Sequence, residues 1–332
     1  MKNLQSSNFY TFRQNFNAFL ESIFLTPADT FDNVKGQFPI GFFIWNTAKK
    51  ETFNYIKGDV YDDSGKYLGV KNIYSYDDFK KGKINDWLRN YYDKKGTVIG
   101  IMHNNKTDFQ HNIQVVITSN DNKDHTTPIT AKNLKEMSIY FAVRKVIPAT
   151  WLNDRDQFLY PNKKWEKDKE FQNDCLTYTL FSNNIQSQYG TNHWIPFKEQ
   201  EVNAIQLFKS NFMTDFIKGK IQPDDYKPDI FTVLKEPRAK YVSPLKFSPE
   251  ATAVFDAGRE LWKYYFTFKA ITANPSLYDI REFFQGRNDK GRMNTKSTDE
   301  KYTKLIGELR DKLNILANKI VPKVYEYGFL KE

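Results

Sequence analysis

The sequence has 332 residues, of which 16% are aromatic, and a formal net charge of +9. The aromatic content excludes disorder of the whole chain, and the absence of an apolar run of about 18 residues excludes a membrane-spanning helix. The single cysteine, Cys175, excludes an internal disulfide and a thiolate zinc cluster. The first residues, MKNLQSSNFYTFRQNF, are polar where a signal peptide is apolar, so we expect a cytoplasmic protein.

The positive charge has two interpretations. A basic chain attracts polyanions such as nucleic acid. A lysine-rich surface without such a partner accounts for the same composition. The distribution of charge along the chain must therefore decide between them.

The first ninety or so residues predict a helix, a strand and a hairpin. Residues 9–25 predict an amphipathic helix, because apolar residues recur at helical spacing: Phe12, Phe16, Phe19, Leu20 and Ile23. The run FPIGFFIWN at 38–46 predicts a strand buried on both faces inside a larger sheet. Residues 51–76 predict a hairpin whose DDSG turn gives Gly65 a positive φ. A short helix is expected around Trp87.

The middle of the chain reads as β-rich. Residues 96–104 and 112–120 predict two strands of a hairpin, separated by a polar loop. Residues 137–151, MSIYFAVRKVIPATW, predict a further strand that ends at Pro148. Residues 175–182, CLTYTLFS, fit either a short strand or the start of a helix, and a helix is expected from about Lys198.

The last third reads as helical. Ser248 and Pro249 predict the start of one long helix, and Ser276 with Asp279 predicts a short helix that stops at Gly286. A third helix begins at a capping box from Ser297 to Glu300 and closes at Pro322. The two long helices carry heptad-like apolar seams, which predicts an antiparallel hairpin or a small bundle: Val254, Gly258, Leu261, Tyr265 and Phe268 in one, Tyr302, Ile306, Leu309, Leu313, Leu316 and Ile320 in the other.

These elements predict an α+β fold with three parts. Residues 1–92 supply a helix, a strand of a larger sheet and a hairpin, 93–230 a β-rich α+β domain, and 231–332 a helical domain.

Motifs for cofactors and catalysis are absent from the sequence. No Gly-rich dinucleotide loop follows a strand, no phosphate-binding loop is present, and the four histidines (103, 111, 125 and 193) lack the spacing of metal ligands. Residues 222–231 contain Asp224, Asp225, Lys227 and Asp229, a set that a metal-dependent nuclease could use. A solvated turn rich in Pro and Asp accounts for them better. We therefore predict no catalytic, cofactor or metal site in this chain.

Positive charge gathers near the end. Residues 232–332 contain 19 Lys and Arg against 13 Asp and Glu, and the segment REFFQGRNDKGRMNTK at 281–296 concentrates them between two helices. Arginine grips phosphates or guanine edges, lysine binds phosphates and asparagine pairs with adenine. The predicted DNA-binding residues are Arg281, Arg287, Asn288, Lys290, Arg292, Asn294 and Lys296. An ordinary basic surface loop remains the alternative.

Several segments together resemble a known family: residues 31–47, 59–71, 174–181, 192–202 and 276–294. They are similar to the C-terminal part of bacterial adenine-specific DNA methyltransferases of restriction-modification systems, in the group related to type I modification and type IIG enzymes. The resemblance implies the margin of an S-adenosylmethionine-binding sheet, followed by a target-recognition domain and helical spacers. It implies double-stranded DNA as the partner.

The sequence departs from this family at its active site. The Gly-rich cofactor loop and the catalytic Asn-Pro-Pro-Tyr loop are missing, and the nearest string is Asn274-Pro275-Ser276-Leu277. The resemblance therefore implies a split subunit, a truncated gene or a fragment. Methylation would need S-adenosylmethionine on a separate methyltransferase subunit. The alternatives are a helical scaffold protein that does not bind DNA, and the metal-dependent nuclease.

Overall fold

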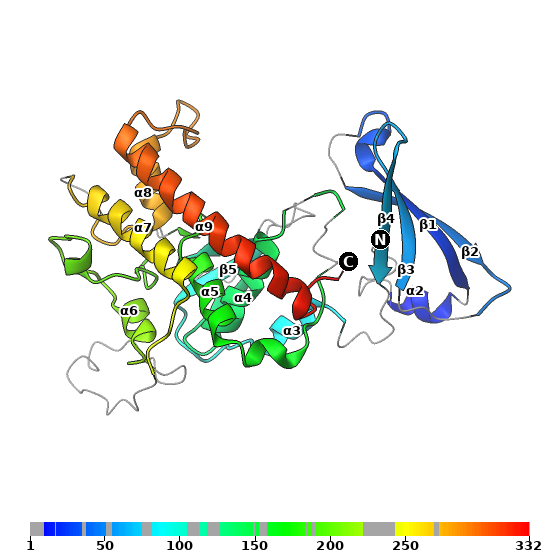
Figure 1. Cartoon of the computed structure of the whole chain (residues 1–332), viewed down its shortest axis with the longest axis horizontal. Helices are drawn as coiled ribbons and strands as arrows, with labels where there is room; N and C mark the ends of the chain where they lie inside the picture. Colours follow the sequence, from blue (N-terminus) through cyan, green and yellow to red (C-terminus); the bar gives the residue numbers. More distant parts are fainter. Residues whose placement is uncertain are drawn as a thin grey trace.

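The computed structural model has a mixed α+β fold with two four-stranded sheets among the residues that it describes (Figure 1). One sheet stands apart at the N-terminal end of the molecule with the short helix α2 (Tyr10–Asn15), and the other helices gather around the second sheet. The described residues are 10–16, 18–34, 38–50, 55–74, 82–104, 113–117, 126–148, 150–152, 158–183, 185–186, 190–221, 243–268 and 272–331.

The N-terminal sheet is mixed and has the strand order β2-β1-β3-β4. Strand β1 (Phe19–Pro27) pairs antiparallel with β2 (Pro39–Asn46) and parallel with β3 (Tyr55–Tyr61). Strand β4 (Tyr67–Tyr74) follows β3 in the predicted hairpin, which is confirmed, with Gly65 at φ +81° in its turn. A 3₁₀ turn, η2 (Ala28–Thr30), follows β1.

Two predictions for this region are wrong. The helix expected over 9–25 is only α2 (Tyr10–Asn15), and the chain then becomes β1. Strand β2 is not buried on both faces, because it is an edge strand with Phe42 40% and Ile44 53% exposed. An apolar run alone does not tell whether its second face is covered.

One face of the N-terminal sheet has a small core of its own. Its buried members are Leu20, Ile23, Leu25, Val60 and Ile73, and Trp151 and Leu152 pack against them from the rest of the chain.

The second sheet lies among the helices in the order β7-β5-β6-β8. A short helix, α3 (Ile84–Arg89), precedes it. Strands β5 (Gly100–Asn104) and β6 (Ile113–Val116) pair antiparallel, which confirms the predicted hairpin pairing. Strand β7 (Thr126–Ile129) pairs with β5, and β8 (Ile185–Gln186) pairs with β6.

The middle of the chain is more helical than predicted. The strand expected over 137–151 is wrong: α4 (Leu134–Lys145) occupies this region and buries nine of its twelve residues. Residues 175–182 belong mainly to α5 (Lys169–Leu180), and the turn η4 (Lys163–Glu166) precedes it. The helix expected from Lys198 is also wrong, since only the turn η5 (Glu199–Glu201) forms there before α6 (Phe212–Ile217).

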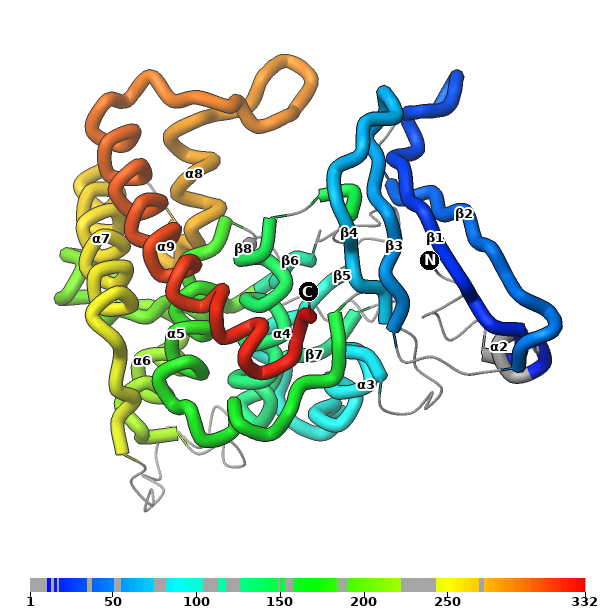
Figure 2. Tube along the Cα trace, turned by 45° about the vertical axis from the view of Figure 1, so that its right-hand side comes forward, coloured from blue at the N-terminus to red at the C-terminus, as the bar shows by residue number. Residues whose placement is uncertain are grey.

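The last third contains the predicted helices α7 (Pro249–Tyr265), α8 (Leu277–Gln285) and α9 (Glu300–Glu326). Helices α7 and α9 lie side by side and antiparallel (Figures 1 and 2): Lys319 of α9 pairs with Glu250 of α7, and Tyr264 bonds to Asp299 at the other end. Two details differ from expectation. Asp299 caps α9 in place of Ser297, and the helix continues past Pro322 because buried Ile320 and Val324 hold it on both sides.

One large hydrophobic cluster extends from Ile84 to Leu330. It includes residues on both sides of 231, because the helices of the last third pack onto α4 and α5. The domain boundaries stay a prediction. Among the described helices, none combines the length and apolar character needed to cross a membrane.

Candidate DNA-binding surface

The connection between α8 and α9, residues 286–298, is an ordered hairpin that we name the basic loop. The Ser276–Asp279 capping box starts α8, and Gly286 ends it at φ +63°. An antiparallel bridge then joins Arg287 to Met293 across the loop. The loop projects from the end of the molecule where α8 and α9 meet (Figure 1).

Arg287 is tied into this loop. Its guanidinium donates to Glu282 Oε1 at 2.5 Å, to the Gly291 carbonyl at 2.6 Å and to the Tyr278 hydroxyl at 3.3 Å. The hydrogen bond to Glu282 is the main reason that the pKa of Arg287 is raised. Because its charge is balanced by Glu282, this residue shapes the loop.

The two asparagines and Arg281 also have internal partners. Asn288 Oδ1 accepts from the amides of Lys290 and Arg292 at 3.0 Å each, which is an Asx turn. Asn294 Nδ2 donates to the Gln285 carbonyl at 2.9 Å, and Arg281 Nε donates to Gln285 Oε1 at 2.7 Å. Their side chains are engaged in building the loop, which the sequence did not indicate.

The other three predicted DNA-binding residues are differently placed. Lys290, Arg292 and Lys296 are exposed, and their side chains have no hydrogen-bond or ion-pair partner within the described part of the chain. They gather on one projecting hairpin. These three cations are available to an external anion.

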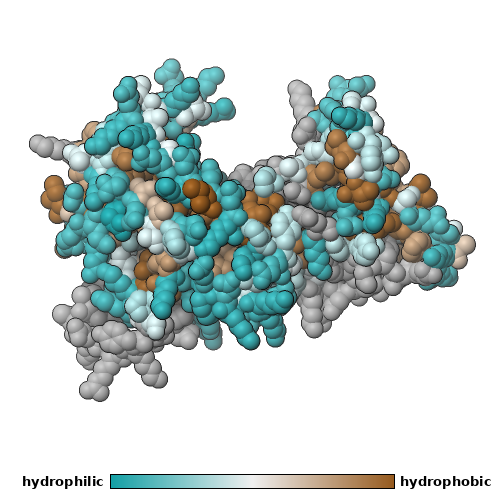
Figure 3. Space-filling view, in the orientation of Figure 1, coloured by the Kyte–Doolittle hydropathy of each residue, from teal (hydrophilic) through white to brown (hydrophobic). Residues whose placement is uncertain are grey.

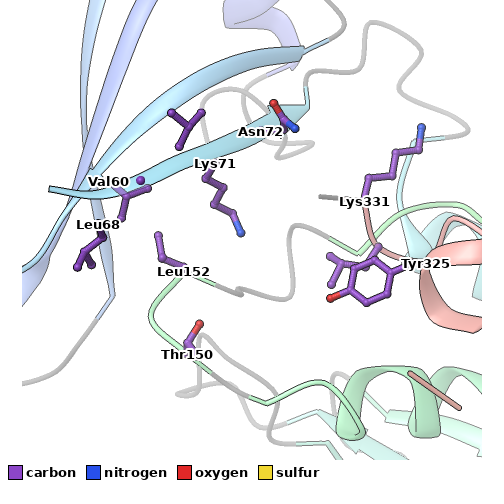
Figure 4. Close-up of a pocket in the computed structure, with 11 residues that line it drawn as sticks. Val60, Leu68, Lys71, Asn72, Thr150, Leu152, Tyr325 and Lys331 are labelled. Carbon is purple, nitrogen blue, oxygen red and sulfur yellow. The ribbon is translucent and has the colours of Figure 1, made fainter. Parts of the chain in front are cut away.

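A second positive feature lies between the N-terminal sheet and the end of α9. A cavity of about 510 Å³ opens there, and side chains from both parts of the molecule line it (Figure 4). Lys71 of β4 and Lys331, which follows α9, supply its charge. No Asp or Glu is among its described lining residues, which are Val60, Leu68, Gly69, Val70, Lys71, Asn72, Thr150, Leu152, Tyr325, Leu330 and Lys331.

The space-filling view shows a notch between the helical part and the N-terminal sheet (Figure 3). The basic loop stands on one side of this notch and the sheet on the other. That Lys71 and Lys331 line one cavity could not be predicted, because the two residues are remote along the chain and belong to no motif.

The Asn-Pro string is structural. Asn274 is buried, and its side-chain oxygen accepts from the Lys209 amide at 2.9 Å. Ser276 caps α8. Asn274 therefore lacks the exposed amide that a base-binding loop requires.

The remaining candidates for a catalytic or metal site lie partly outside and partly inside the described residues. Asp224, Asp225, Lys227 and Asp229 lie outside the described residues, and so do His111 and His125. His193 Nδ1 lies 2.8 Å from Ser210 Oγ, and burial lowers the pKa of the imidazole to about 4. Within the described ranges, His, Cys, Asp and Glu form no group of three that could hold a metal ion. Cys175 is buried, and burial raises its pKa.

Comparison with protein-family models, curated proteins and solved structures finds no match to this chain.

Proposed function

We propose that this chain is the DNA-recognition portion of an adenine-specific DNA methyltransferase of a restriction-modification system. The observation that carries the proposal is the basic loop, on which Lys290, Arg292 and Lys296 are exposed and have no side-chain partner among the described residues. The positive cavity between the sheet and α9 supports it. The sequence resemblance supplies the family.

In this proposal the DNA duplex lies in the notch. Lys290 and Lys296 hold phosphates from the side of the basic loop, and Lys71 and Lys331 face the phosphates from the floor. Such contacts fix the register of the protein on the duplex. Arg292 reads a base edge, because a guanidinium forms two hydrogen bonds to guanine in the major groove.

Catalysis needs a second chain. Asn274, in the string nearest to the catalytic loop, does not fit a flipped adenine, since it is buried and bonded to the backbone. A separate subunit would hold the cofactor.

The salt dependence of DNA binding tests the proposal. Each phosphate contact to duplex DNA contributes about 0.9 to the slope of log affinity against log salt. We expect the triple variant Lys290→Ser, Arg292→Ser, Lys296→Ser to lower this slope by about 2. Fluorescence anisotropy with a labelled duplex at several salt concentrations measures it.

A matched triple variant controls for net charge. Lys163, Lys164 and Lys167 are exposed lysines in and beside η4, and their replacement by Ser removes the same charge. The wild-type slope should persist in this control. Equal slopes in all three proteins would remove the basic loop from the DNA interface.

A scaffold function is the second candidate, but the heptad seam cannot be the surface that binds its partner. The heptad seam expected to bind a partner helix is occupied inside the chain, because α7 packs on α9 and Leu309 and Leu316 are buried. Replacing Leu309 by Asp would therefore unfold the protein before it reported on a partner. The observation that favours this candidate is the exposed apolar face of the N-terminal sheet.

A further inference from the structure

The N-terminal sheet exposes a largely apolar face, which we name the outer face, on which Asp59 of β3 is the charged residue between Phe24 and Val70. Phe24 and Phe42 pair across β1 and β2, and their rings stack with centroids 4.7 Å apart. Ile44 on β2 and Val70 on β4 extend the face toward its two edges, and they are 53% and 54% exposed. Figure 3 shows apolar side chains gathered on this end of the molecule. A patch of this kind marks an interaction surface.

The outer face continues to an open edge. Strand β2 pairs only with β1 among the described residues, and in Figures 1 and 2 it lies on the side of the sheet away from helices α3 to α9. Its eight residues, PIGFFIWN, include no charged side chain. Exposed edges of soluble proteins usually carry lysine, a bulge or a cover that prevents pairing. Among the described residues, the interior of β2 carries no lysine and no strand pairs with its open side, and the bulge of the β1–β2 pair lies in β1, between Leu20 and Ser22.

The main-chain groups that point outward follow from the pairing with β1. The Ala28 amide donates to the Phe38 carbonyl at 2.9 Å, just before Pro27 pairs with Pro39. Residues of an antiparallel strand alternate between facing the partner strand and facing away from it. Gly41, Phe43 and Trp45 therefore present their N–H and C=O groups to the open side.

We infer that β2 pairs with β2 of a second copy of this chain, antiparallel and centred on Phe43. In this register Phe43 bonds to Phe43 of the copy, and Gly41 bonds to Trp45 of the copy. All three outward-facing residues then have hydrogen-bond partners. Each sheet continues into the other as one sheet of eight strands.

The side chains of β2 favour a second copy of the chain as the partner. On the outer face the register sets Phe42 directly opposite Ile44 of the copy, an aromatic and a β-branched residue that stabilise cross-strand pairs. Since β2 contains no charge, two copies bring no like charges together within the paired strands. The strand is complementary to itself, so a different partner is not required.

The interface is small. One strand pair and its flanking side chains bury less area than the roughly 1,200 Å² of a standard stable complex. We expect a reversible dimer with a dissociation constant in the micromolar range.

Sedimentation velocity from about 1 to 100 μM, a range that brackets micromolar affinity, tests the inference on the full chain. Wild type should shift from monomer to dimer over this range. The double variant Phe42→Lys, Ile44→Lys places lysines opposite each other twice in the dimer, so its dissociation constant should rise by more than about tenfold. Hydrogen exchange of Gly41–Trp45 should slow in wild type as the protein concentration rises.

The matched control is Leu68→Lys, Val70→Lys in β4. These residues are as exposed as Ile44, but they lie on the opposite edge strand. This variant should dimerise like wild type. A wild-type protein that stays monomeric at the highest concentration overturns the inference. This holds even if β2 then proves to pair with a different protein. Equal dimerisation of both double variants overturns it too, because the dimer then uses another surface.

Discussion

At the scale of single residues, Lys319 joins three helices. Its Nζ lies 2.6 Å from Glu170 Oε1 of α5, 2.9 Å from Glu250 Oε2 of α7 and 3.4 Å from Asp174 Oδ2. The side chain of Asp174 is only 2% exposed, and burial raises its pKa. Ser248, the N-cap of α7, donates a hydrogen bond to the same carboxylate. Lys319 therefore balances a buried charge at the junction of these helices.

Replacing Lys319 by Met should lower the free energy of unfolding by about 2 kcal/mol at pH 7, because Asp174 keeps its charge without a cation. A carboxyl whose pKa is higher in the folded than in the unfolded state gains stability as the pH falls. The difference between wild type and this variant should therefore shrink between pH 7 and pH 5. Urea denaturation at both pH values measures it.

The control makes the Lys319→Met change in a protein that already carries Asp174→Asn. With the buried carboxyl replaced by an amide, the stability difference between these two proteins should depend little on pH. If this difference stays equally pH-dependent, Asp174 is not its source.

At the scale of secondary-structure elements, two glycines in α7 and α9 have opposite surroundings. A Cβ at Gly258 would lie 2.2 Å from a ring carbon of Phe181, whereas a Cβ at Gly307 would meet nothing within 4 Å. Helix α7 thus approaches the end of α5 closely at Gly258. Gly307 sits in α9 with open space around it.

Substitution of each glycine by alanine should have opposite effects. Gly258→Ala should reduce the free energy of unfolding by about 1–3 kcal/mol, because the methyl group overpacks the Phe181 contact. Gly307→Ala should raise it by about 0.5–1 kcal/mol, since alanine favours a helix interior. Thermal denaturation of both variants measures this. A loss of stability in Gly307→Ala would contradict the open space around a Cβ at this position.

The helices of the last third could be predicted because their signals are local. Capping residues and seams lie within a few turns of one another, and Ser248 and Ser276 cap α7 and α8 as expected. Helix α4 could not be predicted in this way. It is buried on nearly all sides, so its apolar residues show no helical periodicity. Strand β1 was mistaken for a helix because its pairing with β2 and β3 depends on residues remote in sequence.

At the scale of the whole molecule, the chain has two hydrophobic cores of unequal size. The core of the N-terminal sheet is small, and the other core extends from Ile84 to Leu330. Stability follows the amount of buried apolar surface, and regions with few buried contacts open first. The N-terminal sheet should therefore unfold before the rest.

A matched pair of substitutions separates the two cores. Ile23→Val in β1 removes one methylene group from the small core and should destabilise it by about 1 kcal/mol. Ile139→Val in α4 makes the same change in the large core, where Ile139 is also fully buried. Hydrogen exchange should show faster opening of β1 and β3 in the first variant only. A single shared transition affected equally by both variants would contradict two units of different stability.

The candidate DNA-binding surface could be predicted only in part from the sequence. Clustered charge located the basic loop, but it could not separate Arg287, which is paired with Glu282, from Lys290, which points to solvent. That distinction depends on the folded path of the loop. The cavity with Lys71 and Lys331 depends on how the sheet meets α9, which no local pattern encodes.

The burial of Cys175 has a practical consequence. Cys175 is the only thiol in the chain and is inaccessible, and its raised pKa disfavours the reactive thiolate. Cysteines introduced at exposed Lys290 and Lys66 would then take maleimide fluorophores selectively. Energy transfer between the two dyes would report the distance between the basic loop and the N-terminal sheet, without further engineering of the background.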